Sequence, residues 1–142
     1  MRCALMATAK IVQSAFTLLE LAIVVAVIGT LLTIAIPSYR QYVQRAHRAD
    51  AVREIFAAAE CQARIKAQTG YFDTTRCVPT HVDLRYEFRF EPVDVLTSDH
   101  FTLTALPLDG QEDNCNSLSL GHTGTRQVGN PGASVSKCWG GR

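Results

Sequence analysis

Apolar residues fill the chain almost without interruption from Leu21 to Ile36. One carboxylate, Glu20, stands just before this run, and Pro37 follows its end. The wider apolar segment, residues 16–36, would reach roughly 31 Å as a helix, about the hydrocarbon thickness of a bilayer. A charge at the centre of a membrane helix costs about 2.5–3.5 kcal/mol on insertion scales. Glu20 is therefore a candidate functional residue.

Beyond the proline, apolar residues recur every three or four positions, which is typical of an amphipathic helix. We expect one helix over about residues 17–67, kinked at Pro37 and weakened at Gly29, with Gly70 just past its end. Within this helix, the apolar stripe over residues 46–63 is the available cover for a sheet. Its members are Ala46, Val52, Ile55, Phe56, Ala59 and Ala63.

After residue 83 the hydrophobic period changes from 3.6 to 2. Residues 84–91 alternate apolar and charged side chains, and residues 101–105 and 117–120 alternate apolar side chains with threonine or serine. This alternation predicts half-buried strands, and the short turn-rich connections between them favour an antiparallel meander. We therefore expect an α+β fold, with a long kinked helix packed on three to four antiparallel strands.

The same pattern divides the chain into a leader (1–15), a hydrophobic helix for membrane insertion and assembly (16–44), and a globular head (45–142). Without Arg2 and Lys10 of the leader, the chain carries 12 basic and 13 acidic side chains. A balance this even gives no overall electrostatic sign of a nucleic-acid partner.

Three interpretations compete for the apolar segment. A secretory signal peptide has a shorter apolar region of 7–15 residues and a small-residue cleavage site, for which Thr33-Ile34-Ala35 is a poor match. A plain membrane anchor is the second, and in it Glu20 would be an interfacial residue that reaches the lipid headgroups. The third interpretation is a helix that forms filaments.

Four cysteines lie in the polar part of the chain, and a fifth, Cys3, lies in the leader. An even set of four in a small domain suggests two disulfides and an oxidising compartment. Of the three possible pairings we favour the local one, because each bond then closes a short loop. No CxxC pair exists, which disfavours a zinc site. The favoured pairs are Cys61–Cys77 and Cys115–Cys138.

The sequence offers no catalytic constellation. The four histidines, at positions 47, 81, 100 and 122, share no metal-ligand spacing, and no Ser–His–Asp or Cys–His arrangement can be argued. The segment 109–114 is acidic and could hold calcium with loop oxygens, but an acidic turn is the simpler interpretation. We expect no enzyme activity, no metal, no cofactor and no small-molecule substrate.

A minor alternative concerns the end of the chain. Arg126, Lys137 and Arg142 could form a small DNA-contacting patch together with Trp139. The simpler role for Trp139 is packing.

The segment Ala15-Phe16-Thr-Leu-Leu-Glu20-Leu, followed by the apolar run and by Ile36-Pro37-Ser-Tyr39, resembles a type IV prepilin. The remainder is similar to the globular head of a type IVa pilin, with strands followed by a cysteine-bounded tail. Within that family the chain is most similar to the small minor pilins of the PilE type. The N-terminal motif is highly specific, and the resemblance of the head is looser.

This resemblance implies roles for single residues. A prepilin peptidase would cut between Ala15 and Phe16 and methylate the new amine of Phe16. Glu20 would be the acid required for assembly, and Gly29 and Pro37 would mark where the helix can loosen. The family usually has glycine before the cut, so Ala15 predicts slower cleavage.

The implied function is that of a structural minor subunit of a type IV pilus, supporting adhesion, twitching motility or DNA uptake. The alternatives are a pseudopilin of a type II secretion system, a DNA-binding pilin for transformation, and an anchored protein with no filament role. The expected partners are other pilin subunits, the prepilin peptidase and the inner membrane. The chain would span the inner membrane of a Gram-negative bacterium once before it enters the filament.

Overall fold

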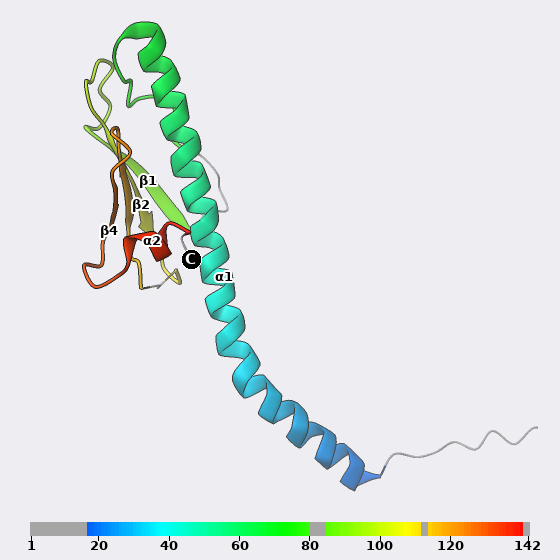
Figure 1. The fold of residues 1–142 in the computed structure, drawn as a ribbon. Helices are drawn as coiled ribbons and strands as arrows, with labels where there is room; N and C mark the ends of the chain where they lie inside the picture. The colour runs from blue at the N-terminus through cyan, green and yellow to red at the C-terminus, as the bar shows by residue number, and fades with distance from the viewer. Residues whose placement is uncertain (1–16, 80–84, 112–113, 141–142) are drawn as a thin grey trace, which may run out of the picture. The chain divides into compact units, whose positions relative to one another are not determined.

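The computed structural model describes residues 17–79, 85–111 and 114–140. It contains one long helix, a four-stranded antiparallel sheet and one short helix (Figure 1). The strands lie in the sheet in their order along the chain, β1-β2-β3-β4. The predicted α+β fold is therefore confirmed. The elements are α1 (Leu18–Thr69), β1 (Tyr86–Glu91), β2 (Thr102–Pro107), β3 (Leu118–Gly121), β4 (Arg126–Val128) and α2 (Val135–Cys138).

The helix α1 continues without a break through Gly29 and Pro37. It ends where the sequence predicts, because Gly70 takes a left-handed conformation with a φ of 84°. The backbone N–H of Gly70 donates to the carbonyl of Lys66 at 2.8 Å, which satisfies one of the last carbonyls of the helix. The predicted helix is confirmed, and the roles of Gly29 and Pro37 as loosening points stay predictions.

The chain separates into two compact units, residues 1–38 and residues 39–142, which are described here one at a time. In the first unit, the large apolar side chains between Leu18 and Ile36 are 46–87% exposed. By length and composition α1 is able to cross a membrane. Apolar exposure on this scale marks a surface that lipid or another protein covers.

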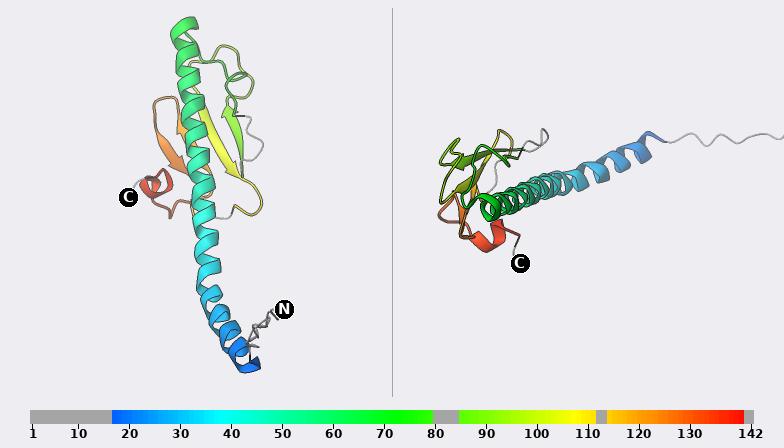
Figure 2. Two further views of the ribbon diagram at one scale, coloured as in Figure 1. Left: turned by 90° about the vertical axis from the view of Figure 1, so that its right-hand side faces the viewer. Right: turned by 90° about the horizontal axis from the view of Figure 1, so that it is seen from above.

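The second unit, which we call the head, holds the hydrophobic core. Phe90 pairs with Leu103 in the sheet, and Leu103 pairs in turn with Leu120, so the inward positions of three strands lie side by side. The head portion of α1 runs along one face of this sheet (Figure 2) and buries Ala51 and Ile55 against it. The predicted strands and their cover are thus confirmed.

The face that α1 turns to the sheet differs from the predicted stripe. Ile55 is buried as expected, but Phe56 is 39% exposed and Ala63 is also exposed. The sheet packs against a face of α1 that is displaced around the helix from its most apolar face. The polar Gln62 is therefore buried, whereas the neighbouring Ala63 is exposed. The prediction was wrong for Ala46, Phe56 and Ala63, whereas Val52 and Ala59 pack at the edge of the core. The buried residues of α1 are Ala51, Ile55, Ala58, Gln62 and Ile65.

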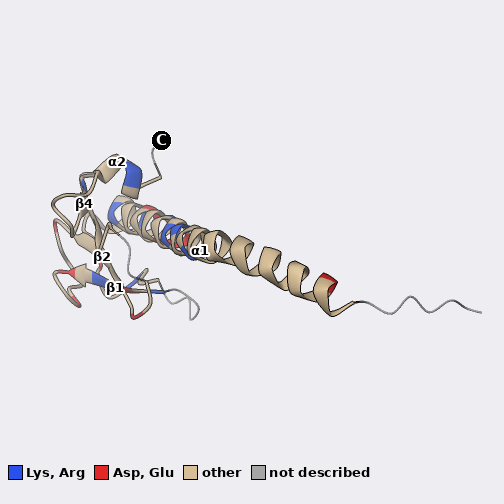
Figure 3. Cartoon of the chain, turned by 90° about the horizontal axis from the view of Figure 1, so that it is seen from below, with Lys and Arg blue, Asp and Glu red and all other residues tan. Residues whose placement is uncertain are grey.

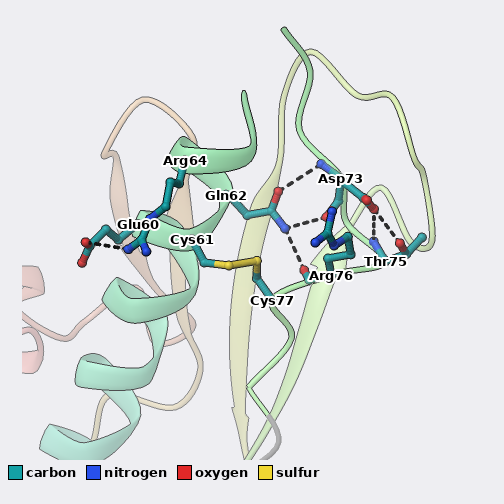
Figure 4. Close-up of a disulfide and its surroundings, with 8 residues drawn as sticks. All are labelled: Glu60, Cys61, Gln62, Arg64, Asp73, Thr75, Arg76 and Cys77. Atoms are coloured by element: carbon teal, nitrogen blue, oxygen red, sulfur yellow. Dashed lines mark hydrogen bonds and ion pairs between the residues drawn. A yellow bond between two sulfur atoms is a disulfide. The ribbon is translucent and has the colours of Figure 1, made fainter. Parts of the chain in front are cut away.

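Both disulfides of the favoured pairing are present, Cys61–Cys77 and Cys115–Cys138. Gln62, next to the first of them, fastens the loop that follows α1 (Figure 4). Its side-chain amide donates to the carbonyls of Asp73 at 2.6 Å and Arg76 at 2.8 Å, and its Oε1 accepts from the N–H of Asp73 at 3.0 Å. A buried glutamine is therefore satisfied by backbone groups that the loop would otherwise leave unpaired.

Candidate nucleic-acid interface

One face of α1 lies beside its core face and borders β4 and α2. Residues recur on it every three or four positions, so they form a continuous stripe along the helix. Most of them are small or basic, which leaves room between the helix and the C-terminal part of the chain. The residues of this stripe are Arg45, Arg48, Ala49, Val52, Phe56, Ala59, Ala63, Lys66 and Ala67.

A first groove, which we call the cationic groove, lies between α1 and α2 and has a volume of about 290 Å³. Arg45 and Lys137 line it with exposed side chains. Arg48 also lines it and donates to the Sγ of Cys115 at 3.1 Å. Because Cys115 is bonded to Cys138 of α2, the disulfide holds Lys137 beside the arginines of α1.

A second groove, which we call the apolar groove, lies between α1 and the β3–β4 hairpin and has a volume of about 510 Å³. Its helix side is built from alanines and Phe56, and its other side includes Phe101 and Leu120. Two basic residues, Lys66 and Arg126, also line it. The apolar groove therefore combines an apolar floor with cationic side chains.

An aromatic junction connects the two grooves. The guanidinium of Arg126 lies over the ring of Phe56 at 5.1 Å and over the ring of Trp139 at 5.7 Å, and the two rings meet edge to face with their centroids 5.8 Å apart. The indole N–H of Trp139 donates to the carbonyl of Gln127 at 3.2 Å, which fixes the ring against β4. Cation–π contacts of this kind hold an exposed guanidinium in place with roughly 0.5–1 kcal/mol.

Charge is unevenly distributed over the head. Residues 114–140 contain Arg126 and Lys137 and no acidic side chain. Among the described residues, no Asp or Glu lines either groove. Figure 3 shows a basic residue, in blue, on α2. A neutral head therefore still presents a local positive strip, which is what attracts an anionic partner.

The positive charge of Lys66 in this strip is partly offset by a nearby carboxylate. Its ammonium lies 4.2 Å from the centre of the Phe72 ring and donates to the backbone carbonyl of Asp99 at 3.5 Å. The hydrogen bond from His100 lowers the pKa of the Asp99 carboxyl, and the charge of Lys66 lowers it further. An ionised Asp99 close by offsets part of the positive charge of Lys66.

The structure tests the predicted tail patch directly. It brings Arg126 and Trp139 into contact and places Lys137 in the neighbouring cationic groove, while Arg142 lies outside the described residues. Trp139 is buried, as expected for a packing residue. The basic residues of α1 and the ring of Phe56 were missed as members of this patch. Their three- and four-residue spacing along the helix was the available signal.

The predicted assembly residues belong to the other unit. Ala15 and Phe16 lie outside the described residues. Glu20 is exposed in the first turn of α1, and its backbone N–H donates to the Oγ1 of Thr17 at 3.2 Å. Thr17 and Glu20 have the spacing of a capping box, so Glu20 also suits the start of a helix. The sequence interpretation missed this second role.

Comparison with known proteins agrees with this architecture. A family model described as "Type IV minor pilin ComP, DNA uptake sequence receptor" matches residues 37–119, more than half of the chain. The chain belongs to this family of type IV minor pilins.

Curated fimbrial proteins resemble this minor pilin over a shorter stretch. It is 52% identical to the fimbrial protein EcpC of Eikenella corrodens over 42 residues, 30% of this chain and 28% of EcpC. It is 53% identical to a fimbrial protein of Pseudomonas aeruginosa over 45 residues, 32% of this chain and 29% of that protein. The match therefore spans less than a third of the length of these relatives.

Two solved structures share the fold. A type IV pilin from Shewanella oneidensis aligns with a TM-score of 0.50 at 24% identity, over 65% of this chain and 96% of that one. The non-core minor pilin PilV of Neisseria meningitidis aligns with a TM-score of 0.50 at 18% identity, over 66% of this minor pilin and 94% of PilV. The long helix packed on an antiparallel sheet is thus a type IV pilin fold.

Proposed function

We propose that this minor pilin binds DNA through the stripe on α1 together with β4 and α2, and that its N-terminal helix carries it in a pilus that takes up DNA. The observation that carries the proposal is the junction of Arg126, Phe56 and Trp139 between two grooves that no acidic residue lines in the described part of the chain. The family description, which names a receptor for a DNA uptake sequence, supports the same conclusion.

The dimensions of the strip suit a nucleic acid. Arg45 and Lys66 are 21 residues apart on one helix, which corresponds to roughly 31 Å along the axis. Each strand of a duplex advances about 3.4 Å per phosphate, so about nine base pairs would lie along this length. A strip with few cations would give a modest affinity that falls as salt is added, because each neutralised phosphate releases counterions.

The N-terminal part of the proposal follows the prepilin motif. A prepilin peptidase would cut between Ala15 and Phe16, and the exposed apolar face of the first unit would pass from the membrane into the core of the filament. Glu20 would pair with the amine of Phe16 on a neighbouring subunit. The contact of this chain with peptidase and with other pilins rests on that motif.

Replacing both Arg126 and Lys137 by glutamine should weaken DNA binding by the full-length protein in detergent. Each lost phosphate contact reduces the slope of log affinity against log salt by about one, so the double variant should lose about two. Fluorescence anisotropy with a labelled duplex, repeated at several salt concentrations, measures this slope.

Arg89→Gln is the matched control, because Arg89 lies on β1 and pairs with Glu87 at 2.9 Å, away from both grooves. It should leave the affinity and the salt slope unchanged. An unchanged slope in the Arg126 and Lys137 double variant, or an equal loss in the control, would refute the proposed interface.

A further inference from the structure

The apolar groove has features that contacts to phosphates alone do not use. Phosphates need cations, which Lys66 and Arg126 provide, but the helix side of the groove is formed by Ala59 and Ala63. Phe56 stands at its edge with 39% of the residue exposed, and the guanidinium of Arg126 lies over its ring at 5.1 Å. An apolar floor, a partly exposed aromatic side chain and flanking cations are the features with which proteins hold single-stranded nucleic acid.

We infer that the apolar groove binds unpaired nucleobases of DNA, while the phosphates that flank them lie on Arg126 and Lys66. This inference rests on the proposed DNA-binding function and names the form of DNA that the site prefers. A base is flat and apolar on its faces, so it can stack on the ring of Phe56 and cover the alanine floor.

The walls of the groove also suit the polar edges of a base. The exposed imidazole of His122 lines one side beside Gly121 and Gly124, whose own N–H groups already donate within the β3–β4 turn. In a duplex the bases are already stacked on each other and their edges are paired. A base can therefore enter the groove only after it leaves the double helix, which costs unstacking and unpairing energy. A single strand or an overhanging end avoids that cost.

Charge alone predicts the opposite preference. A duplex carries a higher density of phosphates than a single strand, so counterion release favours the duplex on a purely cationic surface. A preference for single strands would therefore come from base contacts. The floor of the groove is the place in the described head where the structure combines such contacts with cations.

The test compares a labelled 20-nucleotide single strand with the corresponding 20-base-pair duplex, using full-length protein in detergent at one salt concentration. The wild type should bind the single strand about fivefold to a hundredfold more tightly, which is the range expected for stacking of one base. Ala63→Leu, which fills the floor of the groove, should remove this preference by weakening the binding of the single strand more than the binding of the duplex.

Ala57→Leu is the matched control, because it makes the same change at an exposed position of α1 outside both grooves. It should keep the preference. Phe56→Leu, which removes the ring, should lose the preference for single strands, as Ala63→Leu does. Thermal unfolding measurements check that each variant is folded. Equal affinity for the two probes in the wild type, or an unchanged preference in folded Ala63→Leu, would overturn this inference alone. Binding of neither probe would overturn the proposed function with it.

Discussion

Glu20→Gln is expected to stop the minor pilin from entering pili, although the protein is still made, cut and methylated. The proposed cleavage would leave a cationic amine on Phe16, and the proposed partner of that amine is the carboxylate of Glu20 on a neighbouring subunit. Removing one partner of a buried ion pair costs about 3–5 kcal/mol. Such a loss corresponds to a factor of more than a hundred in the equilibrium of assembly.

Glutamine is the informative substitution because Glu20 also occupies the third helical position of α1, where its N–H is capped by Thr17. A glutamine side chain suits the same capping box. Glu20→Gln therefore removes the charge and keeps the start of the helix, whereas Glu20→Val removes both. Immunoblots of sheared pili and mass spectrometry of the N-terminus measure incorporation and processing. Normal incorporation of Glu20→Gln would disprove the pairing, and an uncut N-terminus in the wild type would disprove the prepilin assignment.

Replacing both Cys115 and Cys138 by serine is expected to reduce the stability of the head and also its proposed binding of DNA. The bond joins residues separated by 23 positions, for which the loop-entropy model gives roughly 3–4 kcal/mol of stabilisation. The same bond holds α2, so its loss should release Lys137 and Trp139 from the stripe on α1. Urea unfolding and anisotropy with labelled DNA measure the two effects.

Replacing Cys61 and Cys77 with serine gives the matched control. These cysteines are separated by 16 positions, so the model predicts a similar loss of about 3 kcal/mol. This bond fastens the loop after α1 and contributes to neither groove. DNA binding below the unfolding transition should therefore fall only in the Cys115 and Cys138 variant. An equal fall in both variants would mean that the disulfide acts on stability alone.

Much of this fold follows from local pattern. Residues 84–91 alternate between apolar and charged side chains without a slip, and Tyr86–Glu91 of that segment form β1. The pattern arises because one face of an antiparallel sheet is buried and the other faces solvent. Gly70 predicts the end of α1, because few other residues adopt a left-handed conformation at low cost. Short loops predict the disulfide pairs, because entropy favours closing them.

The interface on the head was harder to predict for two physical reasons. Gln62 is buried because backbone groups of the loop after α1 satisfy its side-chain amide, whereas Phe56 is partly exposed and contacts the guanidinium of Arg126. The grooves form between α1 and later segments of the chain, up to the C-terminal helix α2, so periodicity along one helix cannot show them. The sequence suggested a patch of Arg126, Lys137, Arg142 and Trp139 only as a minor alternative, and it did not indicate the neighbouring face of α1.

The most direct test of the proposed DNA-binding interface is a titration of the isotope-labelled head, residues 39–142, with duplex and single-stranded DNA, followed by NMR spectroscopy. The head is a compact unit that contains the whole core and both disulfides. We predict that amide signals shift at Ala49, Ala63, Gly124 and Gly140, which line the two grooves. Shifts confined to β1, or no shifts at low salt, would contradict the account.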